Sequence, residues 1–170
     1  SGLIIEGNVG IGTTGPGAKL HIADTSGSGD DLFTMDADSV FGVLMRSAGT
    51  SGSGGAVFQF QRSRGTTASR TIVNDGDLVM RLVADGYDGS SFPHLAEIRA
   101  SVDGTPGAGD MPGKLSFFTT PDGSTVGQER LTIKNTGNVG IGTTGPGTIL
   151  DVAGSNIGSG RVVRVWNTDG

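Results

Sequence analysis

The sequence predicts an all-β protein whose main part is an antiparallel meander or a sandwich-like domain. Short runs of alternating apolar and polar residues recur along the chain, as expected of half-buried strands. Aspartate-glycine pairs, which favour tight turns, separate these runs at Asp75, Asp85, Asp88, Asp103 and Asp122. No segment sustains the 3.6-residue apolar period of a long helix.

The composition suggests a chain that needs support from neighbouring chains or repeats. Only 34% of its 170 residues are hydrophobic and 5% are aromatic, while glycine occupies 32 positions. Globular domains have about 45–50% apolar residues when glycine is counted among them, and in this chain glycine supplies a large part of that share. Disorder is the alternative, but a charged fraction of only 17% and regularly spaced turns favour an ordered structure.

The charge and residue types argue against several partners. A net charge of −5 and scattered lysines and arginines leave no basic field for nucleic acid. The absence of cysteine excludes disulfides and thiolate metal sites. No apolar run reaches the length of a membrane span, so membrane insertion is not expected.

The first element is a glycine-rich connector that occurs twice. Residues 7–17 read Gly-Asn-Val-Gly-Ile-Gly-Thr-Thr-Gly-Pro-Gly and return unchanged 130 residues later, at 137–147. The similarity continues, because Leu20 and Ile22 correspond to Leu150 and Val152. The predicted organisation is a connector at 1–24, a β domain at 25–136, a second connector at 137–153 and the start of a further β domain at 154–170, within a longer array.

The strands of the β domain are predicted next. Residues 56–61 place Phe58 and Phe60 on one face and Gln59 and Gln61 on the other, which predicts a half-buried strand. Residues 77–84 are apolar on both faces, which is typical of a central strand.

Three more strands complete the set. Residues 95–102 carry apolar side chains at helical spacing, but alternation and the flanking Pro93 and Asp103-Gly104 favour a strand. Residues 114–119 and 129–134 alternate in the same way, and the latter runs into the second connector.

The connector itself suggests a contact between chains. Val9 and Ile11 share one strand face, as do Val139 and Ile141 in the second copy. The intervening glycines allow close backbone approach, so we expect these four aliphatic residues to meet near the axis of a parallel homotrimer. An ordinary strand and loop in a monomer is the alternative.

The sequence offers no catalytic, cofactor or metal site. A glycosidase needs two carboxylates across a cleft, and the candidates are Asp85, Asp88, Glu97 and Asp110. Most aspartates adjoin a glycine in a turn, which explains them without catalysis. The two histidines lack metal-ligand spacing; His21 is either an outward polar residue or a metal ligand at a three-fold axis.

One loop is the candidate for receptor contact. Tyr87, Asp88, Phe92 and His94 cluster in or beside residues 85–93, and exposed aromatic rings with polar neighbours suit a host-surface glycan or protein. Phe92 before Pro93 is equally compatible with a plug in the core.

The connector, the turn-rich stretch of residues 85–117 and the stretch of residues 119–133 together resemble the repeats of bacteriophage tail-fibre and tail-spike proteins. Such proteins often carry an endosialidase-type chaperone domain elsewhere in the chain, and that domain is not visible here. The resemblance implies a trimeric, elongated virion appendage with intertwined glycine-rich connectors, acting outside the cell. The expected function is a non-enzymatic structural and adhesive repeat; a carbohydrate-active spike domain with an acidic cleft between subunits is the alternative.

Overall fold

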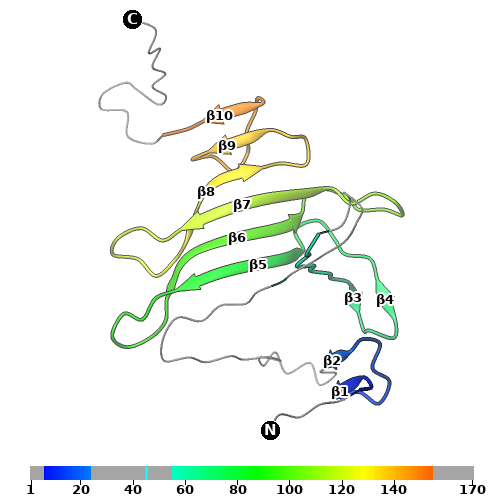
Figure 1. The fold of residues 1–170 in the computed structure, drawn as a ribbon. Coiled ribbons are helices and arrows are strands. Elements are labelled where there is room, and N and C mark those ends of the chain that lie inside the picture. The colour runs from blue at the N-terminus through cyan, green and yellow to red at the C-terminus, as the bar shows by residue number, and fades with distance from the viewer. Residues whose placement is uncertain (1–5, 24–44, 46–54, 155–170) are drawn as a thin grey trace, which may run out of the picture. The chain divides into compact units, whose positions relative to one another are not determined.

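The computed structural model describes residues 6–23, 45 and 55–154, and these form ten strands and no helix. The all-β prediction is therefore confirmed. The chain's internal contacts divide it into two units, Ser1–Val57 and Phe58–Gly170, and each is described by itself (Figure 1). No helix of the described part is long and apolar enough to cross a membrane.

The described part of the first unit contains a parallel pair of strands, β1 (Val9–Ile11) and β2 (Leu20–Ile22). Their register joins residues eleven positions apart, such as Val9 with Leu20. Only the eight residues between the strands make the crossover, whereas parallel strands usually need a dozen or more. The connector is thus a compact parallel joint.

Glycine makes this short crossover possible. A Cβ on Gly10 would lie 2.5 Å from the carbonyl oxygen of Thr13, and one on Gly12, which has a φ of +72°, would lie 2.0 Å from the carbonyl oxygen of Ala23. Side chains therefore cannot occupy these positions. The close approach that the sequence suggested between chains occurs here between parts of one chain.

The second joint repeats the first. Strands β9 (Val139–Ile141) and β10 (Leu150–Val152) are parallel with the same eleven-residue register. The Asn138 side-chain amide donates to the Pro146 carbonyl at 3.2 Å, as that of Asn8 does to Pro16 at 3.2 Å. The repeated sequence therefore encodes a repeated local structure.

The second unit is built on one six-stranded sheet in the order β10-β9-β8-β7-β6-β5 (Figure 1). The four strands before the joint are β5 (Leu78–Asp85), β6 (His94–Val102), β7 (Gly113–Thr119) and β8 (Gln128–Ile133). Every neighbouring pair is antiparallel except β9 and β10. The sheet is a meander, as one of the two predicted forms of the domain requires, and no second large sheet faces it among residues 55–154.

Two strand predictions are wrong. Residues 56–61 form no strand and are exposed, because their alternation has no partner strand in the structure. The strand predicted at 77–84 is β5, but it lies at the edge of the sheet rather than in its centre. The Arg62 guanidinium donates to the Leu78 carbonyl at 2.7 Å, which satisfies one edge group that a neighbouring strand would otherwise pair.

A small hairpin precedes the sheet. Strands β3 (Arg64–Gly65) and β4 (Arg70–Thr71) are antiparallel, and Arg64 holds the buried carboxylate of Asp77 with two hydrogen bonds of 2.6 and 2.7 Å. These bonds, with one from the Asn74 backbone N–H, keep the pKa of Asp77 well below its usual range. The ion pair thereby ties the hairpin to the start of β5.

Most of residues 25–54 and all of residues 155–170 lie outside the described residues. The domain boundaries proposed from the sequence, including the start of a further β domain at 154–170, therefore remain predictions.

Candidate functional site

One face of the six-stranded sheet consists of apolar side chains. Residues that stand opposite each other in neighbouring strands point to the same face, so the register defines rows that cross the whole sheet. Two such rows, which we call the apolar face, are Met80, Ala100, Leu115, Ile133, Val139 and Leu150, and then Leu82, Ile98, Phe117, Leu131, Ile141 and Val152.

None of these twelve residues is buried. Leu150 is 59% exposed, Leu82 47% and Ile141 42%. Among the described residues only Val73 and Val102 are hydrophobic and buried. The apolar face therefore lacks the cover that a sheet normally obtains from a second layer.

The residues predicted for a trimer axis fit into this surface only in part. Val139 and Ile141 are the β9 members of the two rows. In the first joint, Val9 and Ile11 pair with Leu20 and Ile22 in the same register, and Ile11 is 55% exposed. Sequence reasoning missed the other ten members of the face. Alternation shows that they are apolar strand residues, but only the register between strands shows that they lie on one face.

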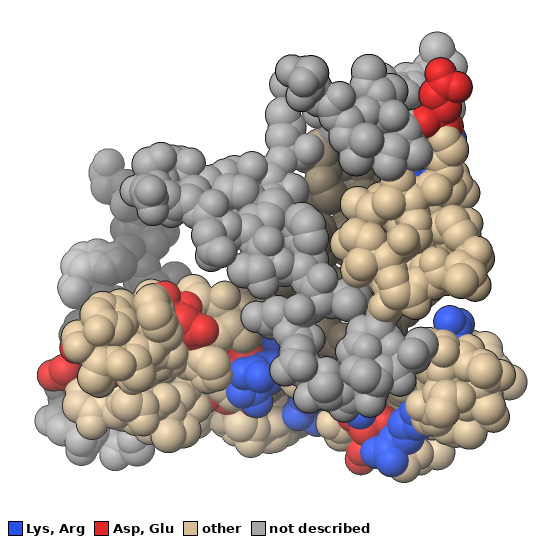
Figure 2. Space-filling view, turned by 90° about the horizontal axis from the view of Figure 1, so that it is seen from below, with Lys and Arg blue, Asp and Glu red and all other residues tan. Residues whose placement is uncertain are grey.

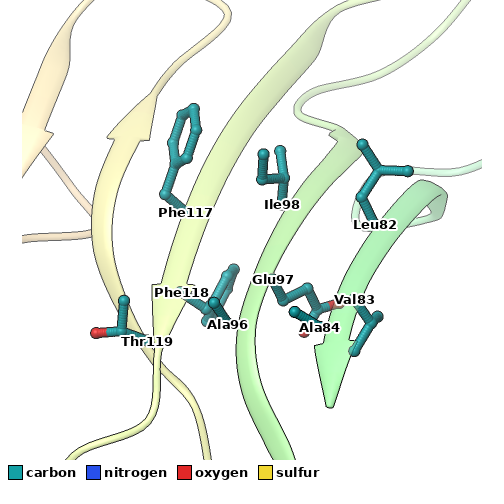
Figure 3. A pocket seen from close by; sticks show the side chains of 9 residues that line it. All are labelled: Leu82, Val83, Ala84, Ala96, Glu97, Ile98, Phe117, Phe118 and Thr119. Carbon is teal, nitrogen blue, oxygen red and sulfur yellow. The ribbon is translucent and has the colours of Figure 1, made fainter. Parts of the chain in front are cut away.

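The apolar face is hollowed near the ends of β5, β6 and β7. Figure 3 shows Leu82, Ile98 and Phe117 side by side on three neighbouring strands. The next row of these strands has the smaller Ala84, Ala96 and Thr119. The step from large to small side chains leaves a cavity of about 440 Å³, which is large enough for a bulky apolar side chain.

The opposite face is polar. The row between the two apolar rows consists of Arg81, Arg99, Ser116, Thr132, Gly140 and Asp151. We call this the polar face. Its centre is dry, since Thr132 is 0% and Ser116 2% exposed, with their hydroxyl groups 3.3 Å apart. Most buried polar groups of this face are therefore paired with one another, and Arg99 Nε and Glu129 Oε1 are buried without a hydrogen-bond partner among the described residues.

Glu97 is the buried charge of the polar face. It is 5% exposed and accepts hydrogen bonds from Arg99 at 2.7 Å and from Arg81. These bonds lower the pKa of Glu97 to about 2. Arg99 also lies over the ring of Phe118, 4.2 Å from its centroid, which adds a cation–π contact.

The predicted receptor loop forms one end of the sheet, between β5 and β6. The rings of Tyr87 and Phe92 lie 5.0 Å apart and are 62% and 68% exposed, so Phe92 is not a core plug. The Tyr87 hydroxyl donates a hydrogen bond to the Gly89 carbonyl at 2.9 Å. This bond holds the Tyr87 ring against the backbone of its own turn.

The Asp88 carboxylate is hydrogen-bonded within its own turn. Its carboxylate accepts hydrogen bonds from the backbone N–H groups of Ser90 and Ser91, both at 2.8 Å. The bonds from Ser91 and Ser90 hold the pKa of Asp88 below its usual range. The role that the structure assigns to Asp88 is thus to shape the loop that presents the aromatic pair.

His94 begins β6 beside this loop. Its Nδ1 lies 2.6 Å from an Asp85 carboxylate oxygen, and its Nε2 lies 3.4 Å from an Arg81 guanidinium nitrogen. His94 and Thr120 line two grooves: one of about 230 Å³ lies between this loop and residues 120–124, and one of about 210 Å³ lies between β6, the end of β7 and residues 120–127. Residues 120–127, which sequence reasoning did not include, are therefore part of the same end of the sheet.

Two of the candidate catalytic carboxylates, Asp85 and Glu97, lie in one chain of contacts that runs through His94 and Arg81. Asp85 pairs with His94, Asp88 caps its turn and Glu97 is held by two arginines. Asp110 lies in the β6–β7 connection, at the opposite end of β6 from Asp85. Asp85, Asp88 and Glu97 thus each have a partner within the chain, whereas glycosidases use two carboxylates that face each other across a cleft.

The ring of His21 is hydrogen-bonded within the first joint. His21 points away from Leu20 and Ile22, and its Nδ1 accepts a hydrogen bond from the Gly17 backbone N–H at 3.2 Å. No group of three metal-ligating side chains occurs in residues 6–23 and 55–154. Figure 2 shows acidic and basic side chains beside each other on the viewed face, without a broad basic field.

Comparison with known proteins finds a likeness in fold. No protein-family model matches the sequence, and no curated protein matches it. A solved structure, the carboxy-terminal domain of the bacteriophage T5 L-shaped tail fibre, is similar with a TM-score of 0.52 and 21% identity over 79% of this chain. The match covers 48% of that structure, so this chain spans about half its length. The chain therefore has an all-β fold similar to that of a tail-fibre domain.

Proposed function

We propose that the chain is a non-enzymatic structural segment of a bacteriophage tail fibre, carried on the virion outside the host cell. One observation carries this proposal: the same parallel joint occurs at two places 130 residues apart, and the second joint closes the six-stranded sheet that precedes it. A module that ends in a copy of its own connector suits an extended array. The fold likeness to a tail-fibre domain supports the same function.

The proposed segment works as a parallel homotrimer. Val9, Ile11, Val139 and Ile141 would pack near the common axis, as the alternation of both joints suggests. Ile11 and Ile141 are 55% and 42% exposed in the single chain, which leaves apolar area for other copies to cover.

The loop end of the sheet is the part proposed to contact a host-surface glycan or protein. Tyr87 and Phe92 supply exposed rings and His94 a polar group at the adjoining grooves. Asp88 contributes indirectly, because its hydrogen bonds hold the turn between the two rings.

The proposal is tested on virions. Gold-labelled antibodies raised against this chain should decorate the fibres of the phage particle that carries it, seen by electron microscopy. Antibodies against an unrelated capsid protein serve as the control for labelling. Labelling confined to the head, or absence of the chain from purified particles by mass spectrometry, would contradict the proposed function.

A second measurement tests the receptor contact. The Tyr87→Ala and Phe92→Ala double variant should lose binding to host cells by about tenfold or more if the rings carry the contact. Ile72→Ala changes an exposed apolar residue outside the loop and should leave binding unchanged. Equal binding by both variants would remove the loop from the proposal.

A further inference from the structure

We infer that the whole apolar face is the surface by which this chain associates with further copies of itself. The inference deepens the proposed homotrimer, on which it rests for the number of chains, by naming a contact surface of twelve residues rather than the two aliphatic positions of each joint. The partner is a second copy of this chain.

The first step is the size of the surface. Six strands about 4.8 Å apart and two rows about 7 Å apart cover roughly 400 Å² in projection. The largest apolar patch on a typical soluble monomer covers about 300–600 Å² and is often functional. Because no row member is buried, the described part of this chain does not cover the patch by itself.

The second step is the charge of the two faces. The chain carries a net charge of −5, so two copies repel each other wherever their acidic groups meet. The two apolar rows contain no charged residue. The polar face instead carries Arg81, Arg99, Glu97 and Asp151. Identical apolar faces can therefore meet without burying like charges.

The third step is continuity along the chain. Val9 pairs with Leu20 and Ile11 with Ile22 in β1 and β2, in the register that aligns Val139 with Leu150 and Ile141 with Val152 in β9 and β10. An array of such repeats thus carries the same two apolar rows at each joint. A surface that recurs with the repeat fits a partner that has the same repeat, which is another copy of the chain.

The fourth step is shape. The cavity beside Leu82, Ile98 and Phe117 has a volume of about 440 Å³, as Figure 3 shows for the side chains that line it. An apolar side chain of a neighbouring copy would fill it and bury those three residues further. The apolar face therefore has a hollow into which a side chain of a neighbouring copy can fit.

The test compares two adjacent residues of β5 that point to opposite faces. Leu82 belongs to the apolar face and is 47% exposed, and Val83 faces the other side and is 40% exposed. Light scattering should give the unaltered chain a mass about three times 17.1 kDa, as the homotrimer requires. Leu82→Lys should shift the mass to that of one chain, whereas Val83→Lys, opposite Glu97, should keep the oligomer.

A second measurement covers the possibility that Leu82→Lys does not fold. The chain has no cysteine, so Leu82→Cys and Val83→Cys each introduce a single thiol. Maleimide should label Leu82→Cys at least tenfold more slowly than Val83→Cys in the oligomer, and at a similar rate in denaturant.

The outcomes separate this inference from the proposed function. A folded, monomeric unaltered chain overturns the inference, even if Leu82→Cys is protected, because a segment of the same chain would then cover the face. If the two thiols are labelled at equal rates in an oligomer, the apolar face is not the contact surface, although the chain can still be a homotrimer. Failure of virion labelling removes the tail-fibre function while the contact surface stands.

Discussion

The two faces of the six-stranded sheet differ in whether their side chains are buried. On the polar face, Thr132, Ser116 and Glu97 are buried, and each finds a partner within the same chain. On the apolar face, Leu82, Ile141 and Leu150 remain more than 40% exposed. The difference teaches that this chain makes most of its buried polar contacts by itself, with Arg99 Nε and Glu129 Oε1 as exceptions, but leaves the apolar face exposed. Burial of apolar area is the main driving force of association, so the unfinished face is the one to disturb first.

The largest effect is expected from charges on the apolar face. Replacing Val139 and Ile141 together by aspartate should abolish the proposed oligomer and lower its melting temperature sharply, because carboxylates would be forced into an apolar contact. Sedimentation and thermal denaturation measure both changes. Gln59→Asp with Gln61→Asp alters two exposed residues and should have little effect; an equal loss in this control would refute the distinction between the faces.

A smaller effect is expected from the buried charge of the polar face. Glu97→Ala leaves Arg81 and Arg99 without their shared carboxylate, and it should lower the free energy of unfolding by about 2 kcal/mol. The arginines are 40% and 37% exposed, so water limits the cost. Urea denaturation measures it, with the exposed Asp122→Ala as control. A cost equal to that of the control would mean that Glu97 is not a central contact.

The same carboxylate makes a prediction for pH. The folded-state pKa of Glu97 is about 2 and its ordinary value is 4.5. Because the folded value is the lower one, the stabilisation is complete above about pH 4.5 and is lost as the pH falls towards 2. Glu97→Gln should remove this part of the acid dependence in urea denaturation at a series of pH values. If the free energy of unfolding of Glu97→Gln depends on pH as that of the unaltered chain does, other carboxylates cause the dependence.

The smallest effect concerns one hydrogen bond in each joint. Gly147 N–H donates to the Asp151 carboxylate at 3.1 Å, at the end of the polar row, and Gly17 N–H donates to His21 Nδ1 at 3.2 Å. Removing the imidazole leaves the Gly17 N–H without its acceptor. In His21→Ala, hydrogen exchange of the Gly17 amide should therefore accelerate severalfold, while that of the Gly147 amide stays unchanged.

The second joint provides the control for this last prediction. Asp151→Ala should accelerate exchange of the Gly147 amide and leave that of the Gly17 amide unchanged. If the Gly17 amide exchanges equally fast in His21→Ala and in the unaltered chain, the His21 bond does not contribute to the first joint.

Much of the fold could be predicted because its signals are local. The strands at 95–102, 114–119 and 129–134 follow from alternation bounded by turn residues, and the structure has β6, β7 and β8 there. The strand at 56–61 had the same alternation but no partner. Alternation alone therefore predicts which residues can form a strand, and pairing decides which of them do.

The candidate site could be predicted less well. Tyr87, Phe92 and His94 lie at one end of the sheet as their loop suggested, yet Asp88 is committed to hydrogen bonds within the turn. Residues 120–127, which line the same grooves, are more than 25 residues away in the sequence. Proximity of this kind depends on the antiparallel order of β5 to β8, which local sequence does not encode.

The sequence by itself determined the joints. The eleven repeated residues adopt the same register and side-chain bonds in two surroundings, since β9 pairs with β8 as well as β10, whereas β2 is the only described partner of β1. Their glycines exclude other conformations locally. Only the tertiary structure decided that β5 is an edge strand and that twelve apolar residues from six strands share one face. The physical reason is register: a shift of one residue in any strand would turn its side chains to the opposite face.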